Sequence, residues 1–422
     1  MLEPDTMNST ELRSLQEQRF QDVISLFWTT PLYHHKLQQA GLTLNQIRSL
    51  SDLSSIPFTT KDDLRQTHPS ERSPYSSGNI EYLFSSSGTS GEPTVYYWTH
   101  QDTEVLREAG ARAMRRVGIT ADDLALVLAP LGLPIMWYCM FQQYNALGAG
   151  VIPLGARPPS EVVDALLAFP ATVITTLPVI GTRLREFMMG TGIEWPENRP
   201  LRQFHCGGDF LTEARRRRIE YLWGVQCYNF FGMSEIFGPI AGECSHRSGM
   251  HFLADYVHLE VLDPDTRLPV PDGHPGIAVY TTLWPKGSLL LRYWSDDFVI
   301  INQNVCACGA TSPRITFLGR PLDMAWVNGC RLFTSQVEET VLTFPEVGGE
   351  YQLHLASHPD GESANLIVEE IPGAQVPVTE VRDALGNLLK IPVTVETAVA
   401  GTLPRDTPKL RRIFDHRQEN TQ

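Results

Sequence analysis

Four short apolar runs between residues 124 and 209 constrain the fold of this chain more than any other feature. They occupy 124–130, 150–156, 172–178 and 203–209, and each ends in or near proline or glycine. Segments with helical spacing of apolar residues alternate with them, at 102–117, 137–148, 160–169 and 179–189. Strands that alternate with helices predict a largely parallel sheet with helices on its faces. The expected fold class is therefore α/β.

The regions on either side of this core follow different patterns. Residues 1–70 are predicted to be mostly helical, and short runs at 258–263, 277–282, 289–294 and 297–302 predict an antiparallel or barrel-like part. Further on, helices are expected at 334–343 and 377–389, with strands at 351–357, 364–369 and 392–397. We therefore expect a large N-terminal domain of several subdomains over 1–318 and a small α+β domain over 319–422.

Composition excludes several classes of protein. The chain has 422 residues, and its 34 basic against 48 acidic side chains give a net charge of −14. Because phosphate contacts require clustered Lys and Arg, we expect no nucleic-acid partner. With 42% hydrophobic and 19% charged residues, the chain can bury a large core, which excludes global disorder.

The uncharged stretch between Asp123 and Arg157 is long enough to cross a membrane. It contains three prolines and four glycines, however, so we interpret it as strand, loop and helix in a soluble core. The N-terminus has neither a basic nor an apolar segment of the kind that signal peptides carry. Seven cysteines, an odd number, favour reduced thiols or metal ligands over disulfides, and we expect a cytoplasmic protein.

A loop rich in serine and glycine, 85–94, follows the apolar residues 82–84. Its hydroxyls and backbone N–H groups could surround a phosphate, although no Gly-Lys-Ser/Thr ends it as in a Walker A loop. On composition alone, a flexible linker is an equal alternative. The expected phosphate contacts are Ser86, Ser87, Gly88, Thr89, Ser90 and Gly91.

This loop resembles the phosphate loop of the adenylate-forming superfamily, which includes acyl-CoA synthetases, adenylation domains and luciferases. Five further segments resemble family motifs in the same order along the chain. They are 207–209, 231–235, 292–297, the hinge that starts at 319–320, and 403–409. Two departures stand out: Glu92 replaces the usual loop lysine, and Leu322 occupies the hinge position of an aspartate, with Asp323 beside it.

The resemblance implies a role for each matching residue. Lys409 would bridge the substrate carboxylate and the α-phosphate, Ser234 would lie near the phosphate, and Glu235 would hold Mg²⁺. Asp297 would accept both ribose hydroxyls. The other expected contacts with ATP or AMP are Gly207, Gly208, Asp209, Asn229, Phe230, Phe231, Gly232, Met233 and Arg320.

Within the superfamily, the chain is most similar to the short phenylacetate–CoA ligase-like branch, because of its length and the segments 231–239 and 333–338. The branch implies an acid pocket between 131–141 and 228–239, although at least half of these side chains are expected to be core. The pocket residues we expect are Trp137, Tyr138, Phe141, Phe237 and Gly238. Such aromatic walls favour an aryl or arylacetic acid.

Three cysteines and a histidine form a possible structural zinc site. Six residues separate Cys244 from His251, and Cys306 and Cys308 add two thiols, which completes a tetrahedral Cys₃His set. His246 and His258 are alternative ligands that fit the spacing less well. The alternative is a group of buried reduced thiols. Cys139, Cys206, Cys227 and Cys330 are interpreted as ordinary core thiols.

The function that follows is ATP-dependent activation of a carboxylic acid to an acyl-adenylate, with transfer to a thiol, most simply that of CoA. The C-terminal domain would rotate between the two steps and carry Lys409 away. One alternative keeps the first step but transfers the acyl group to a phosphopantetheinylated carrier protein or an amine, as in secondary metabolism. Another is a non-catalytic nucleotide-binding homologue. The oligomeric state stays open.

Overall fold

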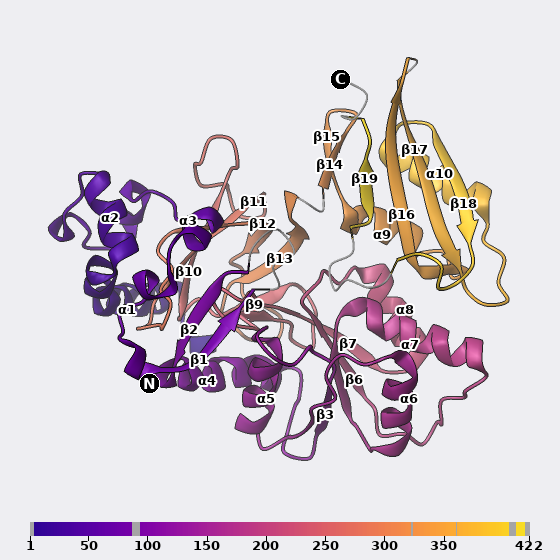
Figure 1. Cartoon of the computed structure of the whole chain (residues 1–422), viewed down its shortest axis with the longest axis horizontal. Helices are drawn as coiled ribbons and strands as arrows, with labels where there is room; N and C mark the ends of the chain where they lie inside the picture. The colour runs from indigo at the N-terminus through magenta and orange to yellow at the C-terminus, as the bar shows by residue number, and fades with distance from the viewer. Residues whose placement is uncertain (1–3, 87–92, 322–323, 360, 405–410, 418–422) are drawn as a thin grey trace. The chain divides into compact units, whose positions relative to one another are not determined.

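The computed structural model describes residues 4–86, 93–321, 324–359, 361–404 and 411–417 (Figure 1). The chain divides into two compact units. Unit 1 comprises 1–156 and 228–317, and unit 2 comprises 157–227 and 318–422. The expected domain boundary after residue 318 stays a prediction, because unit 2 also includes a segment from the middle of the chain.

The N-terminal part of unit 1 is helical, as expected. It contains α1 (Ser9–Thr29), α2 (Pro31–Gln39) and α3 (Lys61–Gln66). Helix α1 starts with a capping box, in which the Asn8 side chain accepts from backbone N–H groups and Glu11 reaches back to the Asn8 N–H. Phe20 and Phe27 of α1 lie in one buried cluster with Leu289, so the helices are held on the strand region by apolar burial.

The α/β part of unit 1 starts with an antiparallel pair, β1 (Ile80–Ser85) and β2 (Val95–Thr99). Helix α4 (His100–Arg116), strand β3 (Leu124–Val127), helix α5 (Met136–Ala146) and strand β4 (Gly150–Ile152) follow. Strands β3 and β4 pair in parallel, as the alternating pattern predicted. The uncharged stretch forms strand, loop and helix, and among the described residues no helix is both long and apolar enough to cross a bilayer.

The rest of unit 1 is a run of strands in the order β10-β11-β12-β13-β9-β8-β7. Antiparallel pairing joins β10 with β11, β11 with β12, and β13 with β9, which confirms the antiparallel interpretation of this region. The bounds are β7 (Gln226–Phe231), β8 (Ala241–Gly242), β9 (Met250–Phe252), β10 (Val257–Leu262), β11 (Pro275–Thr282), β12 (Tyr293–Asn302) and β13 (Arg314–Gly319).

One predicted strand, 289–294, is wrong over most of its length, because β12 begins at Tyr293. Arg292 has a φ of 48°, a left-handed conformation that interrupts an extended chain. Its guanidinium pairs with Glu260 and donates to the Ile56 carbonyl. These tertiary contacts, which no local sequence pattern shows, compensate for the backbone cost.

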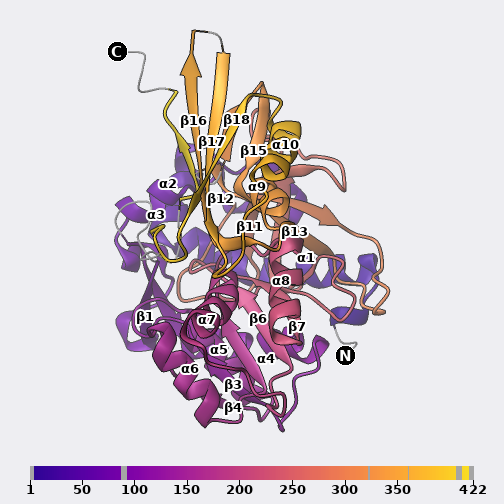
Figure 2. The same ribbon diagram turned by 90° about the vertical axis from the view of Figure 1, so that its right-hand side faces the viewer.

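Unit 2 starts with α6 (Pro159–Ala168), β5 (Val173–Thr176), α7 (Pro178–Thr191), β6 (Gln203–Gly207) and α8 (Glu213–Trp223). Strands β5 and β6 pair in parallel and every residue in them is buried, as in a sheet covered on both faces. Figure 2 shows α7 and α8 beside β6. The alternating pattern of 172–223 is thus confirmed.

The C-terminal part of unit 2 is an α+β arrangement, as expected. Its bounds are β14 (Met324–Val327), β15 (Cys330–Phe333), α9 (Thr334–Val341), β16 (Val347–His358), β17 (Gly361–Glu370), α10 (Val378–Leu389), β18 (Val393–Ala398) and β19 (Ile413–Asp415). The sheet order is β18-β17-β16-β19 (Figure 1). Val337 of α9 and Leu385 of α10 share one buried cluster with Leu353 of β16, so both helices cover the same face.

Candidate active site and cysteine–histidine cluster

The described residues 86 and 94 form the base of the serine- and glycine-rich loop. The Ser86 N–H donates to the Thr94 carbonyl at 2.9 Å, and the Thr94 N–H donates to Ser86 Oγ at 3.0 Å. This double contact closes the loop directly after β1 and before β2. The remaining predicted phosphate contacts, Ser87, Gly88, Thr89, Ser90 and Gly91, lie outside the described residues.

A tight turn follows β7 in unit 1 and carries six predicted site residues: Gly232, Met233, Ser234, Glu235, Phe237 and Gly238. A Cβ added to Gly232 would lie 2.4 Å from the Gly238 Cα, so this close approach of two backbones requires glycine. The Met233 N–H donates to the Phe237 carbonyl at 3.2 Å and closes the turn. The turn holds Ser234 half-buried and Glu235 almost fully buried.

Glu235 accepts a hydrogen bond from the Tyr293 hydroxyl, and the distance between Glu235 Oε1 and the phenol oxygen is 3.2 Å. Burial raises the pKa of Tyr293 well above its ordinary value, and the Glu235 charge raises it further. The phenol therefore stays a proton donor to the carboxylate at neutral pH. The Glu235 carboxylate also acts on a second phenol: burial and then the Glu235 charge raise the pKa of Tyr96 well above its ordinary value. A carboxylate is the type of ligand that a hard cation such as Mg²⁺ prefers, so Glu235 fits the predicted role.

The neighbouring candidates lie on β7 and β12 of unit 1. The Phe231 ring stacks on Phe317 with centroids 5.3 Å apart, and the Asn229 N–H donates to Glu243. Phe230 is buried against Gly242. Asp297 is fully buried in β12, and its N–H donates to Ser295 Oγ at 3.1 Å.

The aromatic candidates for the acid pocket separate into two groups. Trp137 and Phe141 are half-buried on one face of α5, with ring centroids 5.4 Å apart. Tyr138 is instead buried, with its hydroxyl 2.9 Å from Thr103 Oγ1, and Phe237 is fully buried. Their burial agrees with the expectation that much of the set is core. Gly238 accepts from the Gln143 side chain through its carbonyl.

In unit 2, the predicted adenine-side segment follows β6. Gly207 ends the strand, and Gly208 has a φ of 83°, which places the backbone in the left-handed region. The Asp209 carboxylate accepts from the Phe210 N–H at 2.9 Å. Arg320 is half-buried after β13. Lys409 and the hinge residues 322 and 323 lie outside the described residues.

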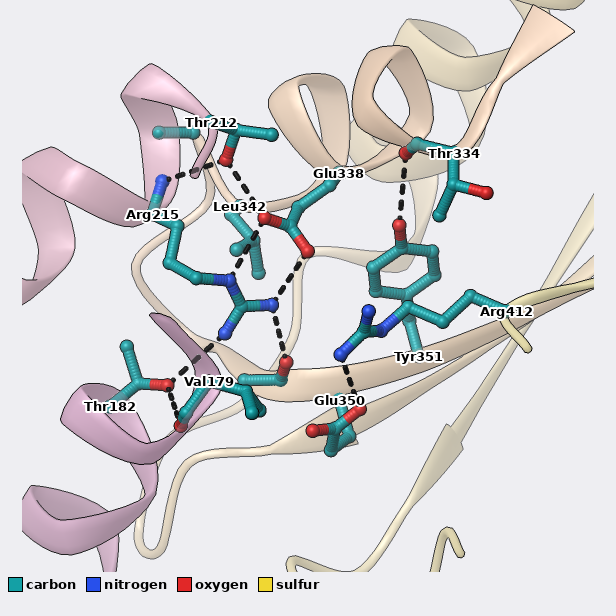
Figure 3. A network of polar contacts seen from close by, with 12 residues as sticks. Val179, Thr182, Thr212, Arg215, Thr334, Glu338, Leu342, Glu350, Tyr351 and Arg412 are labelled. Atoms are coloured by element: carbon teal, nitrogen blue, oxygen red, sulfur yellow. Dashed lines mark hydrogen bonds and ion pairs between the residues drawn. The ribbon is translucent and has the colours of Figure 1, made fainter. Parts of the chain in front are cut away.

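A buried polar network connects α8 with the C-terminal part of unit 2 (Figure 3). Arg215 donates to both carboxylate oxygens of Glu338, at 2.9 and 2.7 Å, and to the Gly349 carbonyl. Both charged side chains are 1% exposed. Arg218 donates to three backbone carbonyls of the same part, those of Leu342, Phe344 and Val347.

The predicted zinc ligands, Cys244, His251, Cys306 and Cys308, come together in unit 1, with all four ligand atoms within 4.8 Å of one another. The Cys244 and Cys306 sulfurs are 3.8 Å apart. A tetrahedral zinc with Zn–S bonds of about 2.3 Å separates two sulfur ligands by about 3.8 Å, so the spacing fits this ion.

His251 presents the correct nitrogen to this cluster. Its Nε2 lies 3.4 Å from Cys308 Sγ, while its Nδ1 lies 3.0 Å from Ser312 Oγ. Burial lowers the pKa of His251 to about 4, so the ring is neutral, which is the form that binds metal. Cys139, Cys206 and Cys227 are buried as expected, but Cys330 is exposed on the short β14–β15 hairpin, so its assignment as a core thiol is wrong.

Comparison with known proteins identifies the family of this chain. The family model of the AMP-binding enzymes matches residues 24–288, and that of the AMP-binding enzyme C-terminal domain matches 329–417. The chain therefore belongs to the AMP-binding enzyme family.

Relatives and solved structures place it further within that family. It is 31% identical to a phenylacetate–coenzyme A ligase of Thermus thermophilus, over 99% of both chains. It is 28% identical to a phenylacetate–coenzyme A ligase of Escherichia coli, over 98% of this chain and 97% of that one. A crystal structure of 2-hydroxyisobutyryl-CoA ligase in the postadenylation state matches with a TM-score of 0.90 and 25% identity, over 99% of this chain and 92% of that one. The chain is an AMP-forming acid–CoA ligase of the phenylacetate–CoA ligase-like branch.

Sequence reasoning missed three residues that support this site. Tyr293 contacts Glu235, Ser312 contacts the cluster histidine, and Arg412 contacts Asp209. Tyr293 lies inside the 292–297 motif, in which the resemblance implies a role for Asp297. Arg412 lies three positions after Lys409. Tyr293 and Arg412 could therefore have been found by their position in or next to a motif. No sequence pattern pointed to Ser312.

Proposed function

We propose that this ligase activates an aryl or arylacetic acid and transfers the acyl group to CoA. The observation that carries the choice of acid is the half-buried pair of Trp137 and Phe141, which offers flat apolar surfaces on α5. The same helix contacts the end of the Glu235 turn, where the Gln143 side chain donates to the Gly238 carbonyl. The relatives named as phenylacetate–coenzyme A ligases support the same class of acid.

In the first step, a carboxylate oxygen of the acid attacks the α-phosphorus of ATP, and pyrophosphate leaves. Lys409 stabilises the negative charge that develops between the acid and the α-phosphate, together with the loop of Ser86, Ser87, Gly88, Thr89, Ser90 and Gly91. Asp297 holds the ribose, and Phe231 lies near the adenine. Glu235, oriented by the Tyr293 hydroxyl, would hold Mg²⁺, which would supply positive charge beside the phosphates.

In the second step, the CoA thiolate attacks the carbonyl carbon of the mixed anhydride, and AMP leaves with its bonding electrons. The residues 319–422 rotate between the steps and remove Lys409, which opens the path for the thiol. No protein nucleophile takes part, so the chain needs only to bind, orient and exclude water.

Acid-dependent exchange of pyrophosphate into ATP tests the first step. A screen should include phenylacetate, benzoates, aliphatic acids and 2-hydroxyisobutyrate, the acid in the name of one structural neighbour. We expect the highest rates with aryl or arylacetic acids, and about a hundredfold loss in Lys409→Ala with an unchanged melting temperature. The highest rates with aliphatic acids would contradict the choice of substrate class.

Product analysis and exchange assays separate this proposal from two alternative functions. An acceptor other than CoA, either a phosphopantetheinylated carrier protein or an amine, needs the same first step, and mass spectrometry of products with CoA and with a carrier separates these cases. The argument for a non-catalytic nucleotide-binding role is that Glu92 and Leu322 replace a cation and a hinge carboxylate of the family pattern. Exchange with any acid would exclude that role.

We also propose a structural zinc ion held by Cys244, His251, Cys306 and Cys308. All four positions of a tetrahedral ion would be filled by protein, so the ion would stabilise the fold and take no part in the reaction. The test is metal analysis of purified protein: about one zinc per chain is expected, with loss of metal and of stability in Cys306→Ser. Cys330→Ser, an exposed thiol, is the matched control.

A further inference from the structure

Arg412 is a buried cation directly after the segment that carries Lys409. It is 3% exposed and precedes β19. A guanidinium cannot lose its charge to lower the cost of burial, so it requires anionic partners nearby. The carboxylates that compensate its charge therefore determine where the Arg412 side chain lies.

The two carboxylates come from distant parts of unit 2. One guanidinium nitrogen of Arg412 lies 3.4 Å from Glu350 Oε2 on β16, and the other lies 3.8 Å from Asp209 Oδ2 in the loop after β6. The Tyr351 ring lies beneath the guanidinium, with its centroid 5.7 Å away (Figure 3). Burial opposes the charge, but the carboxylates of Glu350 and Glu338 raise the pKa of Arg412 above its ordinary value. Arg412 thus joins the C-terminal strands to the predicted adenine-side loop.

Other buried arginines also join the C-terminal part of unit 2 to α8. Arg215 and Arg218 make that contact through Glu338 and several backbone carbonyls. The bridge of Arg412 instead lies at the end of the lysine segment. Three residues of extended chain span about 10 Å, so fixing Arg412 limits where Lys409 can reach.

We infer that Arg412 is a positioning residue for adenylation: by bridging Asp209 and Glu350, it fixes the chain three residues after Lys409 beside the nucleotide-side loop in the first half-reaction. This inference rests on the proposed function, in which Lys409 acts only in that half. A displacement of about 1 Å in a reacting group can reduce a rate about a hundredfold. Loss of the bridge therefore slows adenylation, whereas thioester formation, which takes place after Lys409 has left, does not need it.

The experiment measures the two half-reactions separately in the full-length protein. Pyrophosphate exchange with the best acid of the screen reports the first, and conversion of the chemically prepared acyl-adenylate with CoA to the thioester reports the second. Arg412→Gln should reduce exchange by about a hundredfold and leave thioester formation within about threefold of wild type. Glu350→Gln should add little to that loss in the double variant with Arg412→Gln, because both changes remove the same bridge.

Arg217→Gln is the matched control, because Arg217 likewise joins two elements of unit 2, α8 and α9, through Glu339 at 3.0 Å, but with 65% of its side chain exposed. The rates of both half-reactions in Arg217→Gln should equal those of the wild type. Exchange by Arg412→Gln within threefold of wild type, or equal loss of both halves, would overturn the inference. If Arg412→Gln does not fold, Arg412→Lys, which keeps the charge but not the two-sided fork, is judged by the same criterion. Absence of exchange by the wild type with every acid would refute the proposed function itself, and the inference with it.

Discussion

Replacement of Glu338 by leucine tests whether the buried pair with Arg215 holds the C-terminal part of unit 2 on α8. Both side chains are 1% exposed, and Glu338 also accepts from Thr212 Oγ1 at 2.8 Å. Removing one partner of a buried pair leaves an uncompensated charge, at a cost of about 3–5 kcal/mol. For a unit of this size, each kcal/mol lowers the melting temperature by about 2–4 °C. We therefore expect a decrease of about 6–20 °C in scanning calorimetry.

The double variant Arg215→Met/Glu338→Leu removes both charges, so it should recover most of the stability that Glu338→Leu loses. Arg217→Met, which breaks the exposed pair with Glu339, should change stability by less than about 1 kcal/mol. If Glu338→Leu is no less stable than Arg217→Met, or if the double variant is the least stable of all, the reasoning about burial is refuted.

The same pair gives the pH dependence a definite sign. Although burial opposes ionisation, the Arg215 charge lowers the pKa of Glu338 below its ordinary value of 4.5. A carboxyl with a lowered pKa in the folded state contributes stability above pH 4.5, and this contribution is lost as the pH falls through the folded-state value. The difference in melting temperature between wild type and Glu338→Leu should therefore be constant near neutral pH and shrink below about pH 4.

Three further predictions concern single contacts. Ser312→Ala removes the contact at His251 Nδ1 and should weaken zinc binding about 10- to 100-fold in a competition titration with a chelator, while unchanged affinity would argue against an orienting role. Tyr293→Phe removes the hydrogen bond to Glu235 and should raise the Mg²⁺ concentration needed for half-maximal exchange about tenfold, whereas an unchanged value would remove Tyr293 from the site. Asn8→Ala removes the N-cap of α1 and should lower the free energy of unfolding, measured by urea denaturation, by about 1 kcal/mol. A variant as stable as the wild type would contradict this.

The local pattern of the chain determined much of the fold. The alternation of apolar and helical segments predicted the parallel pairs β3–β4 and β5–β6. A helix that connects two neighbouring strands brings the chain back to the starting edge of the sheet, so the second strand runs in the same direction as the first. The α+β arrangement of 334–397 followed from the same periodicities. Local periodicity misplaced the strand at 289–294, where the left-handed Arg292 is held by contacts with residues far away in sequence.

For the site, the sequence by itself determined the residue types and their order, because motifs carry their chemistry in short segments. It could propose Cys244, His251, Cys306 and Cys308 as one set, but only the tertiary structure brought their ligand atoms within 4.8 Å. Likewise, the sequence supplied Glu235, whereas the fold decided that the Tyr293 hydroxyl orients it. The bridge from Arg412 to Asp209 spans about two hundred residues of chain, and such ion pairs leave no periodic signal. Ion-pair partners that are far apart in sequence are selected by burial and charge compensation, and these exist only once the chain has folded.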